Sequence, residues 1–256
     1  MIYRTYDDDG VHFDLLKDST GNLYKLAFDI RNYFSYQGQG TGPKGCDSGA
    51  YLFRPSNDLQ DSVRYTVLRN ISTYNGGFVQ ELFMNFTSDS IYRNASACLR
   101  LRYYDESLSS EWEVYLSGLP NDNHGREVTV NWKSFDIKNA GVFYTDSNGL
   151  EMQKRVLDYR PTWNFTSYQK VASNYYPVNS GIAIIDERAK LQMTVLNDRS
   201  QGGSVVQEGR IELMQNRRLF FDDDRGVDEV LNETDQYGNG ISVPARYRLI
   251  FTELKY

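Results

Sequence analysis

Short runs of alternating apolar and polar residues recur along the chain, and they predict β-strands. Apolar and cationic residues alternate strictly over residues 99–103, as expected for a strand that buries one face. The run 111–116 begins in the same way, with Trp112 and Val114 predicted to point into the core. No window of a dozen residues shows a clear helical period of about 3.6. The predicted strands are 62–68, 78–86, 97–104, 111–116, 127–132, 181–185, 191–196, 210–217 and 245–251.

Turn-forming residues separate these runs. Residues 120–125, 148–149 and 237–240 are rich in Pro, Asn, Asp and Gly, which favour tight turns. Aromatic residues make up 14% of the chain, and they fit the half-buried surface of a sheet. Many short strands joined by such turns predict an all-β fold, a large antiparallel β-sandwich with few or no helices. The 256 residues allow one large β domain or two small ones.

Charge and sequence signals bear on the partners and the location of the chain. The net charge of −6 argues against nucleic acid, which would require a basic stripe. No apolar run is long enough to cross a membrane, and the first nine residues lack the apolar segment of a signal peptide. Sequons for N-glycosylation are about twice as frequent as the roughly two or three that chance predicts. This combination indicates an internal piece of a longer secretory chain. The sequons lie at Asn70, Asn85, Asn94, Asn164 and Asn232.

Few residues have the spacing of a catalytic or metal site. Cys46 and Cys98 are either two separate thiols or one disulfide, which would close a loop of about 50 residues and add about 4 kcal/mol in the chain-entropy model. Two cysteines do not form a structural zinc site, which requires four ligands. His12 and His124 do not have metal-ligand spacing, and no G-x-S-x-G segment marks a nucleophilic serine. The glycine-rich stretch 36–50 is interpreted as a loop, because a dinucleotide site would require a helix after it.

Several short motifs identify a family. The chain reads G-A-Y at 49–51, Y-R-P-T-W at 159–163, N-Y-Y-P-V-N at 174–179, D-R-S-Q-G-G at 198–203 and D-D-D-R-G at 222–226. In this order the motifs resemble the C-terminal, all-β half of class II α-mannosidases, the zinc-dependent family 38 glycoside hydrolases. The residues of these motifs are more similar to the lysosomal type than to the Golgi type of the family.

The resemblance implies a fold and a place in a larger enzyme. Residues 1–256 would form a single β-rich domain, a galactose-mutarotase-like supersandwich, with 1–47 as a poorly matching leader and glycine-rich loop within it. In the family an N-terminal α/β half supplies the zinc ligands and the catalytic carboxylates. Those segments do not occur here, so the resemblance assigns this chain no catalytic or metal-binding residue.

The same resemblance implies the partners of the chain. We expect it to pack on the N-terminal catalytic portion of the same enzyme, to be inactive alone, and to help bind mannose-containing N-glycans. The expected location is the lysosome or another compartment of the secretory pathway, or outside the cell. The alternative is a non-catalytic carbohydrate-binding or cell-surface β-sandwich, which would present stacking aromatic side chains on an exposed face.

Two residues carry over from the family as substrate contacts. Tyr51 of the G-A-Y motif would offer a sugar an apolar ring and a hydroxyl group. Arg225 of the D-D-D-R-G motif would donate forked hydrogen bonds to paired sugar hydroxyls. The motifs at 174–179 and 198–203 are interpreted as structural. Without the resemblance, Tyr51 would be an ordinary core or surface tyrosine, and the aspartates at 222–224 a solvated charge run or a weak calcium loop.

Overall fold

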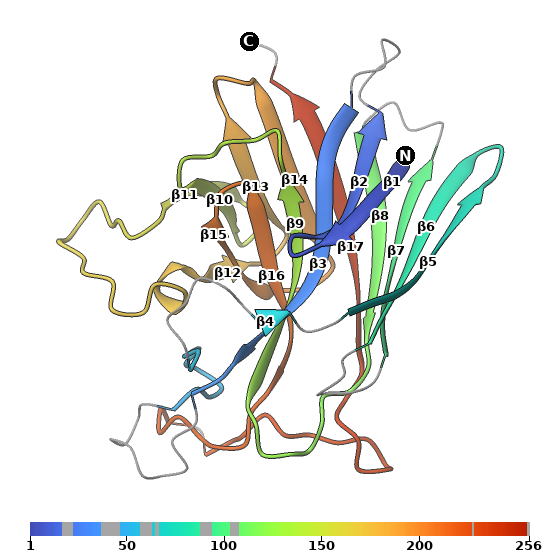
Figure 1. Cartoon of the computed structure of the whole chain (residues 1–256). Helices are drawn as coiled ribbons and strands as arrows, with labels where there is room; N and C mark the ends of the chain where they lie inside the picture. The colour runs from blue at the N-terminus through green and yellow to red at the C-terminus, as the bar shows by residue number, and fades with distance from the viewer. Residues whose placement is uncertain are drawn as a thin grey trace.

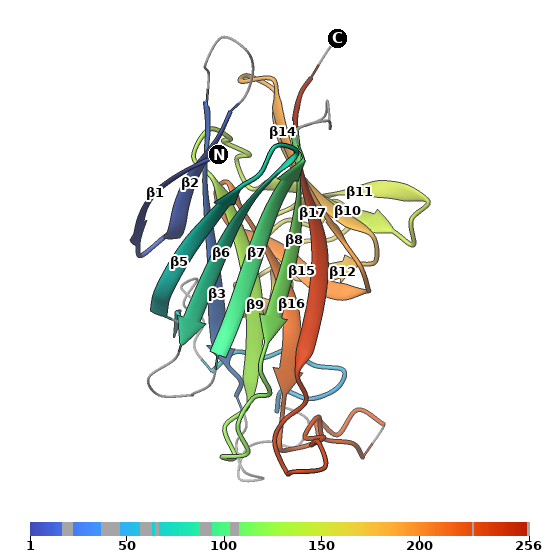
Figure 2. The ribbon, with the colours of Figure 1, turned by 90° about the vertical axis from the view of Figure 1, so that its right-hand side faces the viewer.

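Two antiparallel β-sheets make up the fold in the computed structural model (Figure 1). The structure describes residues 1–16, 23–36, 47–56, 63–64, 67–87, 94–102, 108–226 and 228–254. Within these ranges the predicted all-β sandwich is confirmed, and the one helical element is a 3-10 turn, η1 (Ala172–Asn174). Figure 2 shows β5, β6, β7, β8 and β17 of one sheet side by side, with β3, β9 and β16 of the other sheet behind them.

Strand order defines the two sheets. Among the described residues, the first sheet has the order β1-β2-β3-β9-β16-β15-β12, and β4 pairs with β3. Its strands are β1 (Ile2–Asp7), β2 (Gly10–Leu16), β3 (Leu23–Phe34), β4 (Val63–Arg64), β9 (Arg126–Ser134), β12 (Tyr176–Val178), β15 (Gln201–Gln207) and β16 (Arg210–Arg218). The second sheet has the order β11-β10-β13-β14-β17-β8-β7-β6-β5. Its strands are β5 (Val67–Asn75), β6 (Val79–Thr87), β7 (Asn94–Arg102), β8 (Leu108–Leu116), β10 (Val142–Ser147), β11 (Glu151–Val156), β13 (Gly181–Asp186), β14 (Leu191–Asn197) and β17 (Val243–Glu253).

The core lies between the sheets and is aromatic at its centre. Trp112 of β8 and Trp132 of β9 meet edge to face, with ring centroids 5.8 Å apart. Phe28 of β3 contacts both rings, at centroid distances of 4.7 and 5.6 Å. Such aromatic pairs add about 0.5–1.5 kcal/mol each beyond the area that they bury. Trp112 and Val114 are both buried, so the predicted inward direction of these side chains is confirmed.

The segment 1–47 contributes strands to the sandwich where its described residues lie. β1 and β2 form the edge of the first sheet, and β3 lies between β2 and β9. Phe28 and Ile30 of β3 are completely buried. The central position of β3 therefore depends on residues that the family motifs do not include.

The predicted strand 62–68 is wrong as one continuous element. β4 pairs with β3 in the first sheet, whereas β5 begins at Val67 and forms an edge of the second sheet. The chain thus passes from one sheet to the other within a run that has a single hydrophobic pattern. The other predicted strands overlap β6, β7, β8, β9, β13, β14, β16 and β17.

Candidate functional site

Polar side chains line the outer face of the first sheet, which is turned away from the core. Cross-strand register places Glu127 of β9 between Tyr33 of β3 and Arg217 of β16. Further along the same strands, Asn131 of β9 lies opposite Glu212 of β16. Both carboxylates and the Asn131 amide are buried although they point away from the core. Loops must therefore cover this face, and the buried charges require partners there.

Glu127 and Arg217 form the centre of this polar layer. The Arg217 Nε atom donates to Glu127 Oε2 at 2.5 Å, and its Nη2 atom donates to Oε1 at 3.1 Å. The Ser35 and Ser48 hydroxyls each donate to Glu127 Oε1 at 3.1 Å. Burial alone would lower the pKa of Arg217, but the charge and hydrogen bonds of Glu127 outweigh it and raise that pKa above its usual value. The pair is therefore an anchor held by charge-assisted hydrogen bonds.

Arg217 also anchors the loop that contains the G-A-Y motif. Its Nη2 atom donates to the backbone carbonyl of Gly49 at 2.9 Å and to that of Leu52 at 3.0 Å. The strand that bears Arg217 is in the middle of the sheet, so the loop is fixed to the rigid part of the fold. Tyr51 lies within the loop and is 64% exposed, so its ring points to solvent from an anchored backbone.

Asp223 joins this loop to the D-D-D-R-G motif. Its Oδ2 atom accepts the backbone N–H groups of Tyr51 at 2.8 Å and Leu52 at 2.9 Å. Its Oδ1 atom accepts the backbone N–H of Arg225 at 3.1 Å. A Cβ atom on Gly49 would lie 2.5 Å from the Asp223 Cβ atom, so only glycine allows the carboxylate this approach. One buried carboxylate thus holds both residues that the family resemblance marks as substrate contacts.

A groove of about 590 Å³ opens beside Tyr51. Its walls combine Tyr51 with Tyr175 of the 174–179 motif and with Gln201 and Gly202 of the 198–203 motif. Arg217 reaches it from β16, whereas the described lining does not include Arg225. Three motifs that are far apart in the sequence therefore meet at one surface. The shape and the aromatic and amide lining suit a sugar-sized ligand.

Glu212 lies behind Tyr175, and residue spacing did not reveal its role. The Tyr175 hydroxyl donates to Glu212, and the Tyr33 hydroxyl donates to it at 3.0 Å. Burial raises the pKa of Glu212, and the two tyrosine hydrogen bonds partly offset that rise. Burial and then the Glu212 charge raise the pKa of Tyr175 well above its usual value. Phe53 packs edge to face on Tyr175, with ring centroids 4.9 Å apart, so this wall of the groove is held rigidly.

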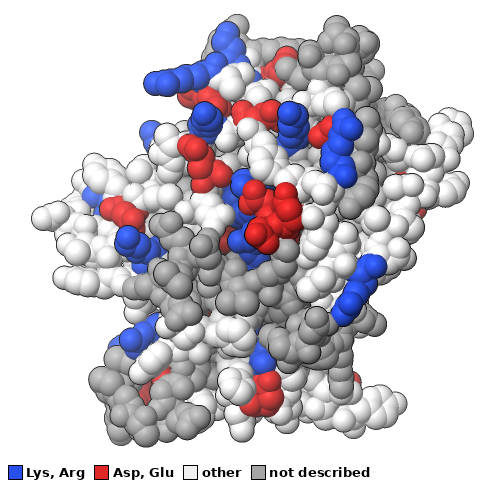
Figure 3. Space-filling model, in the orientation of Figure 1, with Lys and Arg blue, Asp and Glu red and all other residues white. Residues whose placement is uncertain are grey.

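The turn between β1 and β2 covers another part of the same polar face. Asp9 accepts a hydrogen bond from Arg210 Nη2 at 2.8 Å and pairs with Lys133 Nζ at 2.7 Å. Burial would raise the pKa of Asp9, but the Lys133 hydrogen bond and the nearby cations lower it. In Figure 3 acidic and basic side chains are interspersed on the described part of this face.

The disulfide alternative for Cys46 and Cys98 stays a prediction, because Cys46 lies outside the described residues. Among the described residues Cys98, in β7, has no disulfide partner. The cross-strand neighbours of Cys98 are Phe83 on β6 and Glu113 on β8. Burial, followed by the charge of Glu81, raises the pKa of Cys98 to about 11. A thiol with a raised pKa is less often ionised at neutral pH, so Cys98 is a weak nucleophile.

The histidines take structural positions. His12 stacks on Phe135, with ring centroids 5.0 Å apart, and His124 lies in an exposed turn beside Asp122. In the ranges that the structure describes, no three His, Cys, Asp or Glu side chains are grouped to hold a metal ion. Helices long and apolar enough to cross a membrane are likewise absent from those ranges.

The predicted glycosylation sites lie on strands and in loops. Asn70 and Asn85 are cross-strand partners on β5 and β6, and Asn94 is the first residue of β7. Asn164 and Asn232 are exposed outside the strands.

Comparison with known proteins gives consistent similarities. The model of the glycosyl hydrolases family 38 C-terminal domain matches residues 10–225. The chain is 42% identical to lysosomal alpha-mannosidase of Mus musculus over 81% of this chain and 19% of that protein. It is 38% identical to lysosomal alpha-mannosidase of Homo sapiens over 97% of this chain and 23% of that protein. The chain thus spans about a fifth of the length of these relatives.

A solved structure is also similar in outline. It is a galactose mutarotase-like protein from Lactobacillus casei, with a TM-score of 0.37 and 8% identity, covering 93% of this chain and 92% of that one. At that score the similarity adds nothing to what the strand order shows.

Proposed function

Because this chain belongs to family 38 of the glycosyl hydrolases, through their C-terminal domain, we propose that it is the β-rich segment of a retaining α-mannosidase that removes terminal α-mannose from N-glycans. The chain packs on the N-terminal catalytic portion of the same enzyme and completes its substrate pocket. The family match over residues 10–225 and the identity of 42% to a lysosomal alpha-mannosidase support this function.

The shared attachment of Tyr51 and Arg225 to Asp223 is the observation that carries the pocket role. Tyr51 presents an apolar ring and a hydroxyl to a sugar, and Arg225 presents a planar fork of donors. Their backbones are held by hydrogen bonds to one buried carboxylate, so little ordering is needed when a sugar binds. We therefore assign these two residues to sugar binding and orientation.

The bond-making steps belong to the remainder of the enzyme in this proposal. A retaining glycosidase requires two carboxyl groups about 5 Å apart across the scissile bond. By family resemblance these groups and the zinc ligands would come from the N-terminal portion, where zinc would help to bind the sugar hydroxyls. The described residues of this chain hold no cluster that fits a metal ion, so no step is assigned to a metal here. The chain alone should be inactive.

The proposed location is the lysosome or another compartment of the secretory pathway. The relatives from Mus musculus and Homo sapiens are lysosomal alpha-mannosidases. Of the sequon asparagines, Asn70, Asn85, Asn164 and Asn232 have exposed side chains, as glycosylation in that pathway requires.

Complementation tests the pocket role. The chain would be co-expressed with the N-terminal portion of the Mus musculus relative and assayed on a chromogenic α-mannoside at acidic pH with zinc. We expect activity only from the combination, with kcat/KM reduced about 10-fold by either Tyr51→Phe or Arg225→Ala. Tyr237→Phe, at an exposed tyrosine outside the groove, is the control and should change nothing. Full activity in both variants would refute the pocket role, and hydrolysis by this chain alone would refute the division of labour.

A further inference from the structure

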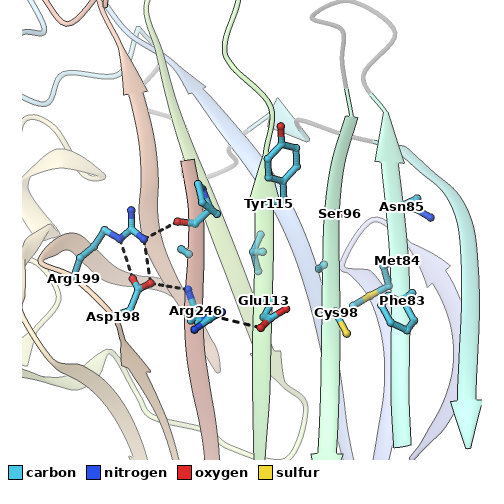
Figure 4. Close-up of a pocket in the computed structure, with 14 residues that line it drawn as sticks. Phe83, Met84, Asn85, Ser96, Cys98, Glu113, Tyr115, Asp198, Arg199 and Arg246 are labelled. Atoms are coloured by element: carbon cyan, nitrogen blue, oxygen red, sulfur yellow. Dashed lines mark hydrogen bonds and ion pairs between the residues drawn. The ribbon is translucent and has the colours of Figure 1, made fainter. Parts of the chain in front are cut away.

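A second groove lies on the outer face of the second sheet, across β6, β7, β8 and β17 (Figure 4). Its volume is about 560 Å³. Cross-strand register places Phe83 and Cys98 in one row of its floor, and Asn85, Ser96 and Tyr115 in the next row. Side chains of these strands form its floor, and Asp198 and Arg199 of the turn between β14 and β15 also line it.

Two aromatic rings on this face are in contact with solvent. Phe83 is 40% exposed and Tyr115 is 42% exposed. Phe83 is not part of the core, because the alternate residues Leu82 and Met84 are completely buried on the other side of β6. An exposed phenylalanine leaves apolar area in water, and a ligand that covers it would stabilise the protein.

Asn85 can supply that ligand. It begins the sequon N-F-T at 85–87, and its side chain is exposed. Phe83 lies two residues before it on the same strand, so both side chains point to the same face of the sheet. Tyr115 lies two strands away, at about 10 Å for strands about 4.8 Å apart.

We propose that Asn85 carries an N-linked glycan whose innermost N-acetylglucosamine packs on Phe83 and whose next residues extend along the groove towards Tyr115. The apolar face of a pyranose ring matches an aromatic ring, and its hydroxyls remain free for polar partners. Glu113 and Arg246, an ion pair with an N–O distance of 3.5 Å, provide such partners in the groove. The glycan thus serves as a covalently attached cover for this face.

The attachment step requires a lipid-diphosphate-linked oligosaccharide as donor. The Asn85 side-chain nitrogen forms a bond to the anomeric carbon of the first sugar, and the bond from that carbon to the lipid diphosphate breaks. The nitrogen loses one proton, which the departing lipid diphosphate takes up. The proposal needs the secretory location proposed above. It does not depend on the roles of Tyr51 and Arg225, so the two proposals can fail separately.

Asn70 is a natural comparison on the same face. It lies directly opposite Asn85, on the edge strand β5, and heads the sequon N-I-S at 70–72. Ser72 is opposite Phe83, so the residue beside Asn70 on this face is a small hydroxyl and not an aromatic ring. A glycan on Asn70 would therefore lack the stacking surface that Phe83 gives to Asn85.

The test uses the full chain, secreted from a eukaryotic cell behind an added signal peptide. Glycopeptide mass spectrometry should show Asn85 occupied. Endoglycosidase H leaves the innermost N-acetylglucosamine and should keep the melting temperature, whereas Asn85→Gln should lower it by about 2–4 °C. In a chain that already carries Phe83→Ser, adding Asn85→Gln should not lower the melting temperature further, because the stacking surface is already removed. Asn232→Gln, at an exposed loop sequon, is the matched control and should have no effect.

Several results would overturn the proposal. An unmodified Asn85 in the folded, secreted chain would show that another occupant covers this face. An equal loss from Asn85→Gln with and without Phe83 would show that the sugar does not stack there. If Asn85→Gln is not secreted, trimming the folded glycoprotein decides the question: endoglycosidase H must preserve the melting temperature and complete removal by peptide N-glycosidase F must lower it.

Discussion

The two outer faces of the sandwich differ in how they treat polar groups. On the first sheet, Glu127 and Glu212 are buried under loops, and each accepts several hydrogen bonds. On the second sheet, Glu113 and Arg246 form a solvated ion pair, and Phe83 is partly exposed. The first face uses its charges to fix the loop of a site, whereas the second leaves a groove open. Charged side chains on a sheet face therefore contribute strongly to folding stability only where loops exclude water from them.

The largest expected effect comes from removing the cation of the buried pair. Arg217→Met leaves Glu127 without its counter-ion and releases the backbone carbonyls of Gly49 and Leu52. We expect a loss of about 3–5 kcal/mol in the free energy of unfolding, measured by urea denaturation. Combining Arg217→Met with Glu127→Gln should recover part of the loss, because no unpaired charge then stays buried. A loss below about 1 kcal/mol would mean that the face is more hydrated than its burial indicates.

The close approach of the loop to Asp223 gives a second test. Gly49→Ala places a Cβ atom 2.5 Å from the Asp223 Cβ atom, so the loop or the carboxylate must move. We expect about 1–3 kcal/mol of destabilisation. Gly77→Ala is the matched control, because a Cβ atom there would meet nothing within 4 Å. Equal effects of the two substitutions would show that the loop yields easily and that its attachment is weak.

The pH dependence of the free energy of unfolding tests the hydrogen bonds that a buried aspartate accepts in the second sheet. Asp146 of β10 accepts backbone N–H groups of Asn179, Ser180, Gly181 and Gly149. Burial by itself would raise the pKa of Asp146, but these donors outweigh it and lower the pKa to about 2. The lowered pKa contributes stability that is present above about pH 4 and is lost as the pH falls towards 2.

The corresponding experiment compares two chains across that range. Wild-type protein should lose about 1–2 kcal/mol more than Asp146→Asn between pH 5 and pH 2 in urea denaturation. This figure is smaller than the full shift implies, because with a pKa of about 2 the carboxyl group of the native protein is only about half protonated at pH 2. Parallel pH profiles of the two proteins would refute the assignment.

The smallest effect should come from the open face. Arg246 is 78% exposed on its side chain, and its partner Glu113 is 48% exposed. Arg246→Ala should change the free energy of unfolding by about 0.5 kcal/mol or less, and added salt should remove even that. A loss comparable to that of Arg217→Met would eliminate the contrast between the two faces.

The alternation of apolar and polar residues predicted strands well where one face of the strand is buried and the other is exposed to solvent. The alternation at 111–116 correctly placed Trp112 and Val114 in the core. β3 was not among the predicted strands although Phe28 and Ile30 alternate with Asp29 and Arg31, and only the structure shows that its polar side chains are buried as well. β12 and β15 are short or glycine-rich, and they become strands through pairing with each other.

The motifs located the site but not its internal structure. Tyr51 and Arg225 were named by family resemblance, and the structure joins their backbones through Asp223. Asp223 stood among three consecutive aspartates, and nothing in the sequence distinguished it from its neighbours. Glu127 and Arg217 are 90 residues apart, so their pairing could not be read from spacing. The sequence pattern of a sheet does not reveal which residues lie opposite one another.

The amino-acid sequence by itself determined that the chain is all-β, that Trp112 and Val114 face inward, and the family to which the chain belongs. These properties depend on side-chain period, turn chemistry and short motifs, all of which are local. Tertiary structure alone decided that the run 62–68 divides between two sheets, that Asp223 joins the two motifs, and that Phe83 and Asn85 share a groove with Tyr115. Those properties depend on which strands become neighbours, and non-local pairing is fixed only when the whole core is buried together.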